Sequence, residues 1–115
     1  MAVEIHNPGG TLNAGRTLPL NVLSMLERMA KKYIWWKSPE EAIAMPDRIV
    51  AQVMDIGDYT DAQELIARVG EDALREVLRD AQAGQFRARS WHYWHYRLGM
   101  ATLEHMPAMP TRSFE

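Results

Sequence analysis

Residues 46–57 read PDRIVAQVMDIG and have the pattern of a short buried helix. The apolar residues fall at helical spacing, which gathers them into one stripe. They are Ile49, Val50, Val53, Met54 and Ile56. Pro46 suits the first turn of a helix, and Gly57 is a residue type at which helices commonly end. The pattern therefore predicts a helix over 46–56 that is buried along this stripe.

The segments before this helix are also helical in pattern. Between Asn21 and Tyr33 the apolar side chains recur at steps of three and four residues, which predicts an amphipathic helix. Its inward residues are Val22, Met25, Leu26, Met29 and Tyr33. Next, Ser38, Pro39 and Glu41 supply an N-cap hydroxyl, a proline at the first position and a capping-box acid. A short helix is therefore expected to start at residue 39.

Three further helices are expected after residue 58. Thr60 and Gln63 repeat the capping-box pattern, so one helix should start there and end at Gly70. A second should run from Glu71 to a stop at Gly84, and a third should have Ser90 as its N-cap and end near Gly99. The inward residues of the first two are Ala62, Leu65, Ile66 and Val69, then Ala73, Leu74, Val77, Leu78 and Ala81.

No stretch alternates apolar and polar residues long enough to predict a sheet. The expected fold class is therefore all-α, a compact bundle of about five to six short helices. Helices this short are marginal alone and gain their stability by packing. We expect a flexible arm rich in glycine and proline at 1–19, the helical domain at 20–100, and a tail at 101–115 that contains Pro107 and Pro110.

Length, cysteine content and charge exclude several classes of protein. The 115 residues suffice for one domain, and the absence of cysteine excludes disulfides, thiolate zinc sites and iron–sulfur clusters. A soluble, cytoplasmic protein is expected, because the sequence has neither a membrane-length apolar run nor the blocks of a signal peptide. The net charge is only -2, yet residues 41–80 carry ten acidic against four basic residues. This acidic middle fits either a solvated helical face or the complement of a basic partner.

The stretch QFRARSWHYWHYRLGM, residues 85–100, combines aromatic side chains with three arginines and no acid. On a helix, Trp91, Trp94 and Leu98 share one face, which we expect to seal the core. One helix cannot bury all of its aromatic residues in so small a domain, so the remainder should contact a partner. The expected partner-binding residues are Arg87, Arg89, His92, Tyr93, Tyr96 and Arg97.

The same residues could also support metal binding or nucleic-acid binding. His92 and His95 are three residues apart and could approach one metal ion, but no carboxylate accompanies them, so surface histidines without metal are expected. The arginines and aromatic rings could instead bind DNA or RNA, which makes a small nucleic-acid-binding regulator the alternative function.

Asp55 and Asp58 flank Gly57 and are expected to be exposed acids of a turn. No catalytic motif is present, so we expect a non-enzymatic protein without cofactors.

Four landmarks occur in a fixed order: Trp35-Trp36, PDRIVAQVMDIGD at 46–58, Gly70 with LREVLRD at 74–80, and RSWHYWHYRLG at 89–99. Together they resemble a bacterial family of short helical domains of unknown function, whose members are often encoded next to AbiEii-type nucleotidyltransferase toxins. The resemblance covers about residues 33–100. It implies an antitoxin-like protein that binds a neighbouring nucleotidyltransferase, and it carries over segment boundaries but no functional residue.

Overall fold

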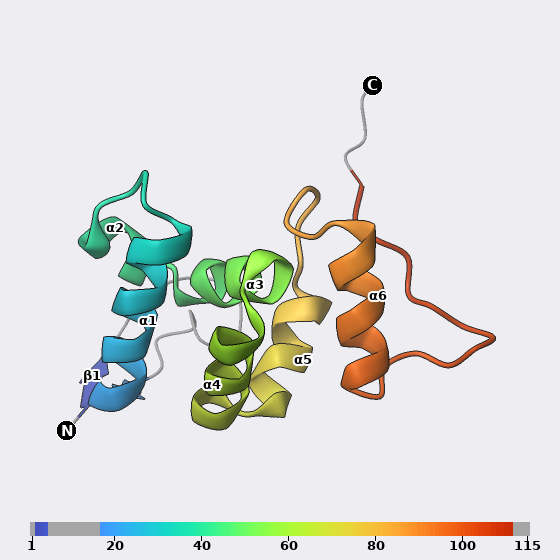
Figure 1. The fold of residues 1–115 in the computed structure, drawn as a ribbon, viewed down its shortest axis with the longest axis horizontal. Helices are drawn as coiled ribbons and strands as arrows, with labels where there is room; N and C mark the ends of the chain where they lie inside the picture. Colours follow the sequence, from blue (N-terminus) through green and yellow to red (C-terminus); the bar gives the residue numbers. More distant parts are fainter. Residues whose placement is uncertain (1, 5–16, 112–115) are drawn as a thin grey trace.

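The computed structural model describes residues 2–4 and 17–111, and within them the chain folds into six helices and one short two-stranded ladder (Figure 1). The elements are β1 (Ala2–Glu4), β2 (Thr17–Pro19), α1 (Leu20–Tyr33), α2 (Pro39–Ile43), α3 (Pro46–Ile56), α4 (Tyr59–Val69), α5 (Glu71–Arg79) and α6 (Ala88–Arg97). The predicted all-α fold class is confirmed. No helix in the described ranges is long and apolar enough to cross a membrane.

The central element is α3, against which α1, α2, α4, α5 and α6 all pack. In Figure 1 it lies between α1 on one side and α6 on the other. Its side chains are buried around most of the helix, and they include Ile49, Val50, Ala51, Val53 and Met54. A helix that is apolar on nearly all sides is stable only when other elements surround it. The other helices meet that requirement and gain their own core contacts in return.

The start and end of α3 follow the sequence pattern. Pro46 occupies its first position, and the helix stops at Gly57, whose N–H donates to the Val53 carbonyl. A Cβ at Gly57 would collide with that carbonyl oxygen and with the Val53 side chain. Glycine is therefore required by this close approach of the backbone. Ile56, which the pattern placed in the buried stripe, is instead 43% exposed at the end of the helix, so that prediction is wrong.

The helices before α3 form as predicted. The predicted inward residues of α1 are all buried, together with Leu23 and Ala30. In α2 the Ser38 hydroxyl accepts the Glu41 N–H, and the Glu41 carboxylate accepts the Ser38 N–H. This reciprocal pair satisfies two helix-terminal donors and fixes the start of a helix only five residues long.

The boundaries of α4 and α5 differ from the prediction. The N-cap of α4 is Asp58, whose Oδ1 accepts the Asp61 N–H at 2.8 Å, so the helix starts before Thr60. An ionised carboxylate at this position satisfies the free donor and complements the helix dipole. At the other end, α5 stops at Arg79 because the chain enters a turn in which the Gln85 side chain accepts the Gln82 N–H.

Both faces of α6 were predicted, but its start was not. Trp91, Trp94 and Leu98 are buried as expected. The helix begins at Ala88 with Arg87 as its N-cap, so Ser90 is not the cap. The Ser90 hydroxyl lies inside the helix and donates to Asp55 of α3, which is a tertiary contact that local sequence cannot encode.

The predicted arm, residues 1–19, falls mostly outside the described residues. Its described parts, β1 and β2, pair antiparallel with Val3 opposite Leu18, and Leu18 is buried against the core. This ladder was not predicted. Of the predicted tail at 101–115, the residues up to Thr111 are described and contain no helix. The Trp91 Nε1–H donates to the Pro107 carbonyl at 2.7 Å, and Met106 and Met109 pack on the core.

Truncating Trp94 tests the packing of α6 on α3. Its ring is 3% exposed and its Nε1–H donates to the Met54 carbonyl at 2.7 Å. We expect Trp94→Ala to lower the free energy of unfolding by ~3–5 kcal/mol, because a large cavity and an unpaired carbonyl remain. The control Tyr93→Ala, at a half-exposed neighbour, should cost under about 1 kcal/mol. Urea unfolding measures both values, and equal losses would contradict the packing described.

Candidate interaction surface

The six residues predicted to contact a partner are all exposed, and the structure brings them together at α6. Five lie within the helix, and Arg87 is its N-cap. Tyr93 is 51% exposed and Tyr96 is 48% exposed, so both rings present apolar surface to the solvent. We call these six residues the α6 face. The buried side of the same helix holds Trp91 and Trp94, so α6 has a core side and an outer side.

The end of α3 positions the N-terminal half of α6. Asp55 Oδ1 accepts the Arg87 N–H at 3.0 Å and the Ser90 hydroxyl at 2.5 Å. The Arg87 guanidinium also donates to the Asp55 carbonyl at 3.2 Å. Asp55 was expected to be an exposed acid of a turn, and this is wrong, because its side chain is only 11% exposed and is occupied by α6. These bonds fix where the α6 face lies.

The C-terminal half of α6 is positioned by α5. Arg75 on α5 donates to the Leu98 carbonyl at 3.0 Å and to the Glu71 carboxylate at 3.1 Å. Glu71 also accepts from Arg97 at 3.3 Å. The result is a chain of charged contacts in which one carboxylate joins an arginine of each helix. Arg97 is therefore exposed but already oriented.

A groove borders the α6 face on one side. It lies between the end of α3, the start of α4 and the start of α6, and has a volume of about 500 Å³. Ile56, Tyr59 and Tyr93 contribute exposed apolar surface to it, and Arg87 and Arg89 contribute positive charge. Sequence reasoning missed Ile56 and Tyr59 as surface residues. Tyr59 directly follows Asp58, the N-cap of α4, and this position at the start of a helix was the available signal that its ring is exposed. The residues that face it across the groove come from another helix, so the sequence did not indicate the groove itself.

The two histidines of α6 do not form a metal site. His92 is exposed, whereas His95 is 1% exposed, with its Nδ1 2.7 Å from the Trp91 carbonyl oxygen and its ring against the Trp91 ring. The expectation of surface histidines is therefore wrong for His95, because the helix turns it into the core. Residues 2–4 and 17–111 contain no group of three or more histidines and carboxylates placed to hold a metal ion.

The positive charge on α6 is partly neutralised within the chain. Arg87 lies 3.5 Å from the Asp55 carboxylate, and Arg97 pairs with Glu71. Among the described residues Arg89 makes no ion pair. A surface that binds nucleic acid relies on several basic side chains that are free to replace counterions at phosphates. The arrangement leaves one such arginine on α6, which weighs against the nucleic-acid alternative.

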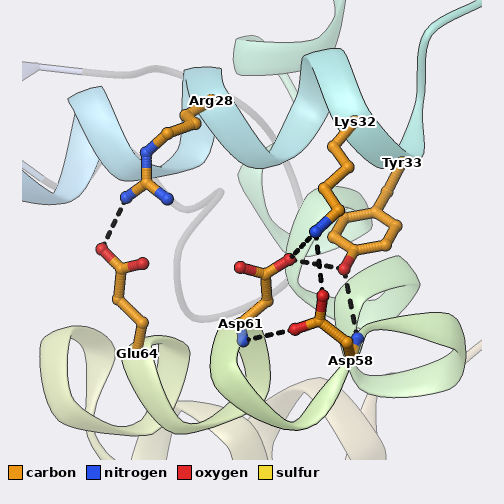
Figure 2. Close-up of polar contacts among 6 residues, drawn as sticks. All are labelled: Arg28, Lys32, Tyr33, Asp58, Asp61 and Glu64. Atoms are coloured by element: carbon orange, nitrogen blue, oxygen red, sulfur yellow. Dashed lines mark hydrogen bonds and ion pairs between the residues drawn. The ribbon is translucent and has the colours of Figure 1, made fainter.

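A second polar cluster joins α1 to α4 (Figure 2). The Tyr33 hydroxyl donates to Asp61 Oδ2 at 2.5 Å and accepts the Asp58 N–H at 3.1 Å. Lys32 donates to both carboxylates, at 2.9 Å for Asp58 and 2.8 Å for Asp61. One turn away, Arg28 pairs with Glu64. Arg28 and Lys32 of α1 thus pair with acids of α4.

The cluster shifts the acid–base properties of its members. The pKa of Asp61 lies below its ordinary value because Lys32 and then Tyr33 donate hydrogen bonds to the carboxylate. The pKa of Asp58 is lowered by the Asp61 N–H and by Lys32. Burial raises the pKa of Tyr33, since it disfavours the phenolate, and the Asp61 hydrogen bond adds to this. Both carboxylates are therefore ionised at neutral pH, and their hydrogen bonds hold α1 against α4.

The comparisons with known proteins give no relatives. No family model, curated protein or solved structure matches the chain.

Acid should weaken the cluster that joins α1 to α4. The folded-state pKa of Asp61 is below the ordinary 3.8, so the unfolded chain takes up more protons as the pH falls. The stabilisation is complete above the ordinary value and is lost as the pH falls through the lower, folded value. We expect the free energy of unfolding to decrease below about pH 4, and to decrease less steeply in Asp61→Asn. Urea titrations from neutral to acidic pH measure both slopes, and parallel slopes would refute this account.

Removing one hydroxyl tests the same cluster at neutral pH. We expect Tyr33→Phe to lower the free energy of unfolding by ~1.5–3 kcal/mol, because a hydrogen bond to a mostly buried carboxylate is lost. The matched control is Tyr59→Phe, since Tyr59 is 75% exposed and its hydroxyl has no partner among the described residues. That control should change stability by less than about 0.5 kcal/mol. Chemical unfolding followed by circular dichroism compares the two, and a Tyr33→Phe protein as stable as the control would disprove the assignment.

Proposed function

We propose that the chain is a non-enzymatic protein-interaction module and that the α6 face is its contact surface. The observation that carries the proposal is the exposure of Tyr93 and Tyr96 on a helix whose other side already completes the core. The Tyr93 ring packs edge-on against Trp94 and the Tyr96 hydroxyl donates to the Thr102 carbonyl, yet about half of each side chain stays open to a partner. Tyrosine and arginine are enriched among the residues that contribute most to binding energy.

The contacts that hold both ends of α6 in place support the same function. Asp55 fixes one end of the helix, and Arg75 with Glu71 fixes the other. A surface held from both ends loses little conformational freedom when a partner binds, which leaves more of the contact energy for affinity. The adjoining groove, lined by Ile56, Tyr59 and Tyr93, adds apolar surface that a partner can cover.

The partner we propose is a nucleotidyltransferase toxin, which makes the chain antitoxin-like and cytoplasmic. The support is the resemblance carried by Trp35-Trp36, Gly70 and the segment at 89–99. Binding of DNA or RNA remains the competing function, and the pairing of Arg87 and Arg97 with carboxylates weighs against it.

The test is co-expression with a nucleotidyltransferase encoded beside this chain in its own genome, followed by purification and measurement of the complex mass. We expect a complex of fixed stoichiometry. Tyr93→Ala and Arg97→Ala should each weaken it at least about tenfold, as expected for residues at a binding hot spot. Circular dichroism should show that both variants remain folded.

The matched control is Trp35→Ala. Trp35 is a more exposed aromatic residue that comes shortly after α1 in the chain, and α1 and α6 lie at opposite sides of the molecule (Figure 1). It should leave affinity unchanged. If Tyr93→Ala and Arg97→Ala proteins bind as tightly as the control, the α6 face is not the contact surface. If the chain binds nucleic acid instead, with affinity that falls steeply as salt rises, the competing function is correct.

A further inference from the structure

A second cavity lies over α3, away from the α6 face. It has a volume of about 430 Å³ and is formed by the end of α1, by α2, by α3 and by the turn at 84–85. This volume falls within the range of about 300–1,000 Å³ that is usual for small-molecule sites. None of its lining residues belongs to α6 or to the groove beside it. Whatever it binds is therefore independent of the proposed function.

The inner surface of this cavity is apolar. Ile34, Ala42 and Ala51 line it and are each less than a tenth exposed, and Met45 is half-buried beside them. Trp36 also lines it and is 57% exposed. An indole left this open to water makes an apolar contact available to a ligand. The cavity can thus cover an apolar group of modest size.

The charges around the cavity favour an anion. Lys37 and Arg48 line it, and neither side chain makes an ion pair or hydrogen bond with another residue of the described ranges. The single acid, Glu41, is engaged with the Ser38 N–H in the capping box of α2. Two cations therefore face one carboxylate that is engaged in the capping box, and Lys37 also attracts that carboxylate electrostatically. The planar guanidinium of an arginine matches a carboxylate with two parallel hydrogen bonds.

We propose that this cavity binds a carboxylate attached to an apolar group, with the apolar group against Ile34, Ala51 and Trp36 and the carboxylate at Arg48 and Lys37. Either a free organic acid or the C-terminal residue of a polypeptide has this chemistry. An isolated surface cation would attract any anion, whereas this site requires both halves of the ligand. That requirement is what the experiment tests.

The probe is 4-phenylbutyrate, titrated into the full-length ¹⁵N-labelled protein, with 4-phenylbutan-1-ol as its uncharged analogue. The readout is the indole N–H signal of Trp36 in the NMR spectrum, assigned by its loss in Trp36→Phe. We expect a saturable shift with the acid and binding of the alcohol about tenfold weaker, the ratio that corresponds to ~1.4 kcal/mol. Acetyl-Ala-Ala-Phe as free acid and as amide forms a second arm, and tighter binding of that acid than of phenylbutyrate identifies a polypeptide terminus as the source.

Arg48→Gln should weaken binding of phenylbutyrate about tenfold. Lys37→Gln should weaken it in the same direction. Arg68→Gln is the matched control, since it removes the same charge from an exposed position on α4 that lines neither cavity, and it should leave the affinity unchanged. The spectra themselves show that each variant is folded. The proposal is overturned if the Trp36 signal does not saturate, if acid and alcohol bind equally, or if Arg48→Gln behaves like Arg68→Gln.

Discussion

The burial of α3 is the constraint on which the rest of the structure depends. Eleven residues of helix cannot be stable alone, and this helix is apolar around most of its circumference. It is stable because five other helices surround it, and each of them completes its own apolar face against it. Removing any one helix would expose part of α3. The core is therefore cooperative, and no pair of neighbouring helices would be expected to fold by itself.

The ends of α3 extend this constraint to the surface. At its C-terminal end Asp55 holds the start of α6 through the Arg87 N–H and the Ser90 hydroxyl, and the Met54 carbonyl accepts from Trp94. Directly after it, Asp58 starts α4 and takes part in the cluster with Lys32. Asp55 near the end of one buried helix and Asp58 just after it thus determine where two other helices begin. The contacts of Asp55 with α6 therefore also determine where the outer side of α6 lies.

The charged residues divide into two groups with different functions. Most of the acids in the acidic middle pair within the chain, as Glu64 does with Arg28 and Glu71 with Arg75. These pairs explain the acidic middle better than a basic partner does. Four cations make no ion pair with another described residue and remain available to ligands. They are Lys31 on α1, Arg89 on α6, and Lys37 and Arg48 at the second cavity.

The sequence by itself determined the six helices and most of the buried residues of α1, α3, α5 and α6, because helical spacing of apolar residues and local capping act between residues close in the chain. It also determined that Tyr93 and Tyr96 face outward, since they are out of phase with Trp91 and Trp94 on the same helix. Tertiary structure decided where α6 begins, that Ile56 is exposed and that Asp55 is occupied. Each of these depends on which helix lies opposite, and contacts between residues more than thirty positions apart leave no periodic signal in the sequence.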